Sequence, residues 1–122
     1  MASETGAVFG PLEAEVMEAL WSAGEPLSVR RVLDVLNKRR RQPLAYTTVM
    51  TVLTRLAEKQ LLRRTAAGRA FVYEPRVSNE AAAAVRGVVR NFGSAAVAQF
   101  VEEASADPAL LKRLERVLKD RS

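Results

Sequence analysis

The sequence contains neither cysteine nor histidine among its 122 residues. Without thiolate or imidazole groups it lacks the usual protein ligands of zinc and iron, and it lacks the commonest general base. No disulfide can form, so we take the cytoplasm as the default compartment. The carboxylates are scattered along expected helix faces, where they form no catalytic constellation. We therefore expect the chain to be no enzyme and to bind no metal or cofactor.

Long apolar runs are also missing. No stretch approaches the roughly 18 apolar residues of a membrane span, so we expect no membrane insertion. Residues 1–10 have neither the basic region nor the apolar region that signal peptides carry. The composition, 48% hydrophobic and 27% charged, is ordinary for a soluble globular protein of one or two small domains.

Positive charge is concentrated in the middle of the chain. The formal net charge is +5, to which residues 1–25 contribute −5, residues 26–76 contribute +9 and residues 77–122 contribute +1. A basic central segment is the electrostatic footprint of a surface that binds a polyanion. A solvated helix face could have the same composition, so charge alone leaves both interpretations open.

Local signals divide the first half of the chain into helices. Gly10 and Pro11 favour a helix start, because proline suits the first helical position, and Gly24 favours its end. Ser28 can cap a second helix, which we expect to run into the basic residues 38–41. The negative end of the helix dipole would account for one or two of those four cations, but not for all of them.

A third helix, predicted from Tyr46–Thr47 to about Lys59, has two different faces. Its apolar residues fall within one arc of about 100°, and polar residues occupy the opposite side. The apolar set is Val49, Val52, Leu53 and Leu56, and the polar set is Thr47, Thr48, Thr51, Thr54, Arg55 and Glu58. We expect the apolar set to pack on a core and the polar set to face outward.

The outward threonines indicate more than a solvated face, where strong helix formers such as Glu, Lys and Ala are favoured. The branched threonine side chain has only middling helix propensity. In the DNA major groove its hydroxyl can bond a base edge and its methyl can contact a thymine methyl. We therefore predict a recognition helix that contacts double-stranded DNA through Thr47, Thr48, Thr51 and Arg55.

Basic residues on both sides of that helix support the prediction. Arg41 precedes it, and Arg64 and Arg69 follow in a predicted hairpin. Two short β-prone runs, 61–65 and 70–73, lie on either side of the connection 66–69, which contains Gly68. Arg69, at the tip, could enter a minor groove, rest on a phosphate or simply solvate a turn. Tyr46 could contact DNA or staple the start of the helix.

The order helix, helix, helix, hairpin is that of a winged helix, which we assign to residues 1–76. Three more helices are expected in residues 77–122, the last of them starting at Asp107 and Pro108. The expected fold class is therefore mainly α with a small β-hairpin wing: a winged helix-turn-helix followed by a three-helix dimerisation domain.

The apolar stripes of the last three helices make too small a core for roughly 45 residues to stand alone. They must pack on the winged domain or on a partner. Two interleaved copies would bury them and place two recognition helices about 34 Å apart, one DNA turn, as a palindromic operator requires. The expected dimer residues are Val85, Val88, Phe92, Val97, Phe100, Val101, Leu110, Leu111, Leu114 and Leu118.

Three segments resemble one known family in their order and spacing. They are Leu12–Met17 followed by Leu20 and Trp21, then Tyr46–Leu56, then Gly68–Pro75. The elements LE-x-x-VM-x-x-x-W and T-V-x-T-x-L-x-RL within them resemble the penicillinase repressor (BlaI/MecI) family. The resemblance is strong over residues 10–76 and loose beyond them.

This resemblance implies a homodimeric winged-helix repressor that binds palindromic operators and often controls β-lactam resistance genes. It places Thr48 and Thr51 at base-facing positions, Arg55 at the basic position of the recognition helix, and Gly68-Arg69 on the wing. A copper-sensing branch of the family has a C-terminal cysteine cluster, which this chain lacks.

Repressors of the family are inactivated when a membrane sensor metalloprotease responds to antibiotic and the repressor is cut at an Asn-Phe bond. The matching pair in this chain is Gln99-Phe100, which keeps the phenylalanine but not the asparagine. Phe100 would also be present as an ordinary residue of a dimer core. The resemblance therefore leaves cleavage at this bond open.

A winged-helix protein-interaction adaptor, without sequence-specific DNA binding, is the alternative hypothesis. The outward face of the third helix distinguishes the two, because an adaptor should present acidic or apolar residues there. The threonines and Arg55 on that face favour DNA.

Overall fold

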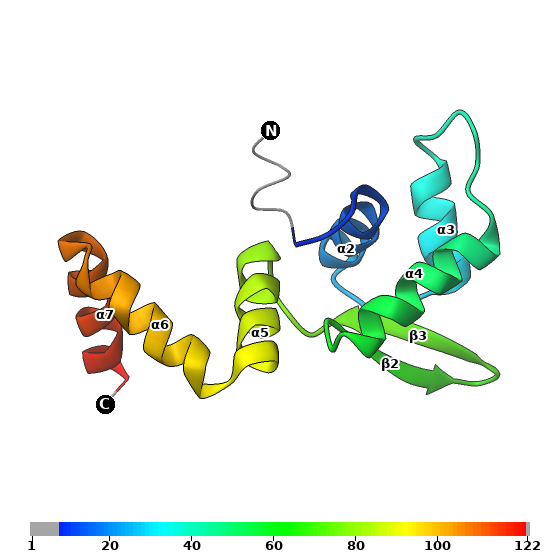
Figure 1. Ribbon diagram of the computed structural model, residues 1–122. Coiled ribbons are helices and arrows are strands. Elements are labelled where there is room, and N and C mark those ends of the chain that lie inside the picture. Colours follow the sequence, from blue (N-terminus) through cyan, green and yellow to red (C-terminus); the bar gives the residue numbers. More distant parts are fainter. Residues whose placement is uncertain (1–7, 122) are drawn as a thin grey trace. The chain divides into compact units, whose positions relative to one another are not determined.

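The computed structural model describes residues 8–121, which form two compact units that meet between Ala84 and Val85. The first unit contains α2 (Pro11–Ala23), β1 (Leu27–Ser28), α3 (Val29–Asn37), α4 (Tyr46–Glu58), β2 (Leu62–Ala67) and β3 (Ala70–Pro75) (Figure 1). Helices α5 (Glu80–Phe92), α6 (Ser94–Ser105) and α7 (Pro108–Asp120) follow, and α5 spans the division. The predicted fold class is confirmed: a mainly helical chain with a winged helix first and further helices after it.

Capping groups set the helix boundaries. Pro11 is the first residue of α2, and Gly24 ends that helix at a φ of 68°, in the left-handed region that glycine adopts without strain. The Ser28 hydroxyl accepts a first-turn N–H of α3 at 3.1 Å. The Asp107 carboxylate accepts two N–H groups at the start of α7. All three predicted helix starts are confirmed.

The core of the first unit is built from the apolar faces of α2, α3 and α4 together with the sheet. Its largest fully buried side chains are Met17, Leu20, Leu53, Leu56, Leu62, Val16, Val32 and Val49. All four residues of the expected inner face of α4 are buried, and its threonines lie outside this core. The predicted two-sided character of α4 is therefore confirmed.

The sheet differs from the prediction in two respects. Its order is β1-β3-β2, and β1, which pairs Leu27 with Tyr73, was not predicted because two residues are too short for an alternating pattern. Ala66 and Ala67, expected in the connection, belong to β2 instead. The connection is only Gly68 and Arg69, and glycine fits there because its φ is 65°.

The second helix ends earlier than predicted. We expected it to run into the basic residues 38–41, but α3 ends at Asn37 and those residues follow it in a turn. The N–H of Arg40 donates to the carbonyl of Asn37 at 3.3 Å, in place of a regular helical bond. Asn37 competes with helix continuation because its own side chain bonds the backbone of the following loop.

Helices α5, α6 and α7 bury little. Among their described residues, only Ala83 and Ala104 are buried, while Phe92 is 64% exposed and Val97 is 58% exposed. Helix α6 packs against α7. No helix within residues 8–121 is long and apolar enough to cross a membrane.

Trp21 joins α2 to the segment after the hairpin. Its Nε1 donates to the carbonyl of Val77 at 2.8 Å, and the Phe9 ring meets the indole edge-on with the ring centroids 6.3 Å apart. Val77 is itself buried and this hydrogen bond is partly buried, so water has limited access to the carbonyl.

Replacing Trp21 with Phe should lower the free energy of unfolding by about 1–3 kcal/mol, because the Val77 carbonyl loses its donor. Urea titration of the full chain measures the change. A Phe9→Leu variant is the control, since it removes the ring contact and keeps the hydrogen bond. An unchanged free energy of unfolding in Trp21→Phe would show that this bond does not stabilise the fold.

Candidate nucleic-acid interface

The outward face of α4 is the centre of the candidate site. Thr47, Thr48, Thr51 and Arg55 are all exposed on it, whereas Thr54 is half-buried. Met50 was not predicted as part of the surface, yet it is 40% exposed. Its thioether sulfur is only a weak acceptor, so the side chain would contribute mainly an apolar contact there.

Thr51 is held in one orientation. Its Oγ1 donates to the carbonyl of Thr47, one helical turn earlier, at 2.9 Å. This bond occupies the hydroxyl proton and leaves the methyl group and the oxygen lone pairs for a ligand. Thr51 can therefore meet a base as an acceptor or through its methyl group, a restriction that the sequence did not reveal.

The start of α4 also suits an anion. Ala45, its N-cap residue, provides no side-chain acceptor for the first-turn N–H groups. Free N–H groups and the helix dipole make such an end attractive to phosphate. A shallow groove runs between the start of α2 and α4. It contains the Glu13 carboxylate as well as Arg55, so its charge is mixed, and its lining residues are Gly10, Pro11, Leu12, Glu13, Thr48, Thr51, Val52 and Arg55.

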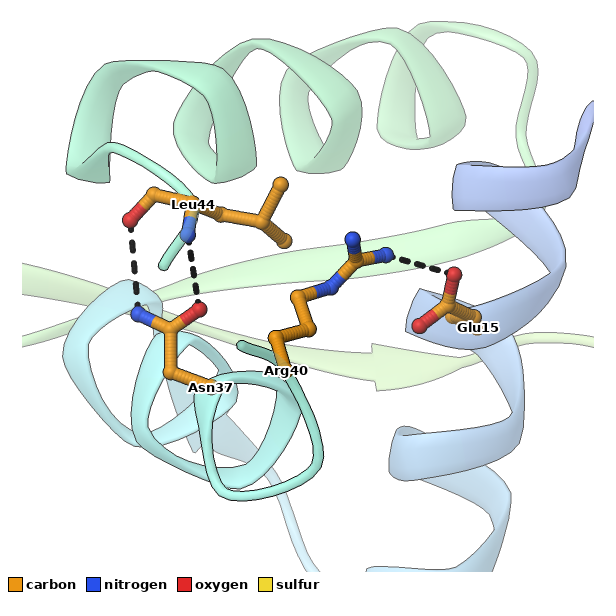
Figure 2. A network of polar contacts seen from close by, with 4 residues as sticks. All are labelled: Glu15, Asn37, Arg40 and Leu44. Carbon is orange, nitrogen blue, oxygen red and sulfur yellow. Dashed lines mark hydrogen bonds and ion pairs between the residues drawn. The ribbon is translucent and has the colours of Figure 1, made fainter. Parts of the chain in front are cut away.

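The loop that leads into α4 is tied at two points (Figure 2). Asn37 Nδ2 donates to the carbonyl of Leu44 at 3.3 Å, and the Leu44 N–H donates to Asn37 Oδ1 at 2.8 Å. Arg40 in the same loop pairs with Glu15 of α2 through Nη2 and Oε2 at 2.6 Å. Together these contacts fix the direction in which the chain enters α4.

Some basic residues of this unit form ion pairs with α2, and others are exposed at the candidate site. Arg40 pairs with Glu15, and Lys59 pairs with Glu13 at 3.2 Å, so α2 supplies an acid for each. The four predicted site arginines are exposed: Arg41 in the loop before α4, Arg55 on α4, Arg64 on β2 and Arg69 in the hairpin turn. Glu13 and Glu15 of α2 therefore neutralise two cations, Lys59 and Arg40, that contact other elements of the fold.

Two aromatic rings lie under arginines in this unit. Arg30 of α3 is 5.2 Å from the centroid of the Tyr46 ring, and Arg64 is 4.4 Å from the centroid of the Phe71 ring. Arg30 and Phe71 were not among the predicted site residues. Sixteen positions separate Arg30 from Tyr46, and no local pattern joins them.

The residues expected to form a dimer all lie in α5, α6 and α7. Leu111 and Leu114 are half-buried; the exposed ones are Val85, Val88, Phe92, Val97, Phe100, Val101, Leu110 and Leu118. Gln99 and Phe100, the candidate cleavage pair, lie inside α6 and line an apolar hollow with Val88 and Phe92 of α5. Within residues 8–121, no group of three or more carboxylates, cysteines or histidines is placed to hold a metal ion.

A three-helix core that ends in a hairpin, with a polar face on its third helix, defines the winged helix-turn-helix class. Two complex structures of hsRosR share this fold, with TM-scores of 0.53 and 0.51 at 14% and 16% identity. The first match covers 99% of this chain and 96% of the other, and the second covers 93% and 91%.

The family follows from the sequence matches. Residues 9–120 match the family model described as penicillinase repressor. The chain is 43% identical over 108 residues to the transcriptional regulator BlaI of two Mycobacterium tuberculosis strains. The matched segment covers 88% of this chain and 72% of each relative. The chain therefore belongs to the penicillinase repressor (BlaI/MecI) family. It is a BlaI-type transcriptional regulator, as the motifs indicated, and its family is one of repressors rather than enzymes.

Replacing Asn37 with Ala should lower the free energy of unfolding by about 1–3 kcal/mol, because two half-buried backbone groups of Leu44 lose their partners. Asn37→Asp keeps the acceptor and loses the donor, so its free energy of unfolding should lie between those of the wild type and Asn37→Ala. Urea titration distinguishes the three proteins. An Asp variant as unstable as the Ala variant would contradict a separate contribution from each bond.

Proposed function

We propose that this chain represses transcription as a homodimer that binds a palindromic DNA operator through α4 and the β2–β3 hairpin. The observation that carries the proposal is the exposed face of α4, with its threonines and Arg55, together with the exposed Arg41, Arg64 and Arg69 on other elements of the same unit. Base edges in a major groove offer partners to threonine, and phosphates on either side offer partners to arginine.

Each side chain has a separate part in the proposed contact. Thr48 and Thr51 face the bases, and Arg55 bonds a guanine or the backbone. Tyr46 and Thr47 lie at the start of α4, where free N–H groups favour a phosphate. Arg41, Arg64 and Arg69 neutralise the backbone, and the hairpin turn lets Arg69 approach the adjacent minor groove.

The dimer is supported by the exposed apolar side chains of the C-terminal helices. Phe92 is 64% exposed, Val85 is 63% exposed and Leu118 is 58% exposed. So many exposed apolar side chains on three helices favour an interface with a partner. A second copy is the partner we propose, because its two-fold symmetry would present two recognition helices to a palindrome about one DNA turn apart.

Regulation of β-lactam resistance genes is the role we propose for the repressor, and the name of its family supports it. We propose release by proteolysis or by another signal, with Gln99-Phe100 as the candidate bond for a membrane sensor metalloprotease. Because both residues lie within α6, that bond could be cut only after α6 opens locally. Phe100 is 47% exposed in the single chain and would be covered in the proposed dimer.

Operator recognition is tested with a duplex selected from a random pool and a random duplex of equal length, at several salt concentrations. Wild-type affinity for both should fall steeply with salt, and the selected duplex should bind at least about 1,000-fold more tightly. Flat salt dependence, or equal affinity for the two duplexes, would contradict the proposed function and favour the adaptor.

Thr51 is tested on the same pair of duplexes. Thr51→Ala should weaken binding to the selected duplex by about 1–3 kcal/mol and leave the random duplex nearly unchanged. Thr51→Val keeps the γ-methyl group and removes the oxygen acceptor, and the hydroxyl proton is already bonded to Thr47 in the wild type. Near wild-type affinity for the selected duplex would assign the contact to the methyl group, and a loss as large as that of Thr51→Ala would assign it to the oxygen. Arg64→Ala should weaken both duplexes alike. Equal losses for Thr51→Ala on both duplexes would remove Thr51 from base recognition.

Phe100→Asp tests the dimer, because it places a charge in the proposed apolar interface. Sedimentation at micromolar concentration should give a dimer for the wild type and for the apolar control Phe100→Leu, and a monomer for Phe100→Asp. Circular dichroism checks that the helices remain. A Phe100→Asp protein that stays dimeric would show that the interface lies elsewhere.

A further inference from the structure

Two arginines of the first unit each lie over the ring of an exposed aromatic residue. Tyr46 is 42% exposed and Phe71 is 45% exposed, so neither ring is part of the buried core. Arg30 lies 5.2 Å from the first ring and Arg64 lies 4.4 Å from the second. The same arrangement therefore occurs at the start of the recognition helix and on the hairpin.

The fold explains how each pair meets. In the hairpin, Arg64 lies opposite Tyr73, and Phe71 lies opposite Ala66, two residues nearer the turn. Arg64 and Phe71 are thus diagonal neighbours on one face of the sheet, within reach of a long side chain and a ring. The other pair joins the first turn of α3 to the first residue of α4, so it depends on the packing of these two helices.

A ring under a guanidinium group restricts the arginine side chain without consuming its hydrogen bonds. The attraction acts on the face of the planar group, whereas the N–H donors lie along its edge. An arginine held in this way keeps its donors for a phosphate and loses less conformational freedom when it binds one. An arginine surrounded only by water has no such restriction, so it loses more conformational freedom when it binds a phosphate.

We propose that Arg30 binds a DNA backbone phosphate, and that Tyr46 and Phe71 are positioning residues that hold Arg30 and Arg64 ready for this contact. The proposal rests on the proposed function, since it adds a phosphate contact and two positioning rings to the same DNA interface. In this proposal the face of the Tyr46 ring positions Arg30, and the exposed Phe71 ring positions Arg64 on the hairpin.

The test uses a random-sequence duplex of about 30 base pairs, because a phosphate contact doesn't depend on sequence. Binding of the full chain is measured over a series of salt concentrations. Arg30→Gln should lower the slope of log affinity against log salt by about 0.9 for each bound protomer, as should Arg64→Gln. Arg116→Gln, which removes the same charge from α7, is the matched control and should keep the wild-type slope.

The ring variants separate positioning from charge. Tyr46→Leu and Phe71→Leu should weaken binding about 2- to 5-fold with the slope unchanged, because the arginine remains but is no longer held. Tyr46→Phe and Phe71→Tyr keep a ring face and should bind like the wild type. Thermal unfolding of each variant is measured alongside, and a merely structural ring would change stability without this rescue pattern in affinity.

The outcomes are distinguishable from a failure of the proposed function. If the wild type shows no salt-dependent binding to duplex DNA, the proposed function fails, and the inference fails with it. If the wild type binds and Arg30→Gln keeps the full slope, Arg30 is no phosphate contact and the inference alone is overturned. If Tyr46→Phe loses as much affinity as Tyr46→Leu, the hydroxyl acts rather than the ring, which overturns the positioning role of Tyr46.

Discussion

The division of α4 into two faces is the constraint on which the rest of this structure depends. Val49, Val52, Leu53 and Leu56 bury one side of the helix in the three-helix core, and this fixes the direction of the other side. A rotation of the helix by about half a turn would carry the threonines into the core and the valines into solvent. Packing therefore decides which side chains the helix can offer to a ligand, before any ligand is present.

Charge is arranged around that helix by the same packing. The acids of α2 meet Arg40 and Lys59 across helix boundaries, so these two cations stabilise contacts between elements. Such half-exposed pairs contribute little energy individually, roughly 0–1 kcal/mol. The Arg40 pair nevertheless joins the loop before α4 to α2, and the Lys59 pair joins the end of α4 to α2. The ring contacts of Arg30 and Arg64 belong to a different group, in which the cation has a neutral neighbour and its charge is not cancelled.

Local and periodic features of this fold could be predicted from the sequence, whereas features made by tertiary contacts could not. Ser28 and Asp107 act within one turn of themselves, and the apolar period of α4 repeats along its own axis, so each leaves a signal in sequence. The end of α3 at Asn37 depends on Leu44, seven residues later. Strand β1 exists because β3 has a free side for Leu27 to pair with.

The same limit applies to the candidate site. The threonines and Arg55 share one helix face, and the order of the elements implied a hairpin beside them, so these residues could be found from the sequence. The contact between Arg30 and Tyr46 depends on how α3 packs against α4, and no local pattern in the sequence predicts that packing. The internal bond of Thr51 was equally hidden, since threonine can either bond its own helix or leave its hydroxyl for a ligand.

In the proposed dimer, the C-terminal helices would extend this dependence to a second copy of the chain. In the proposed DNA complex, one winged domain would make few base contacts, and joining two would make the second binding event effectively intramolecular, which raises affinity without any new type of contact. In the proposed dimer, Phe100 would belong to the apolar surface that joins the copies, and the candidate bond Gln99-Phe100 lies in the same helix. Cutting α6 there would not touch α4, yet it would separate the two recognition helices. Release from DNA would then follow from the lost linkage, with each winged domain still folded around its own buried core.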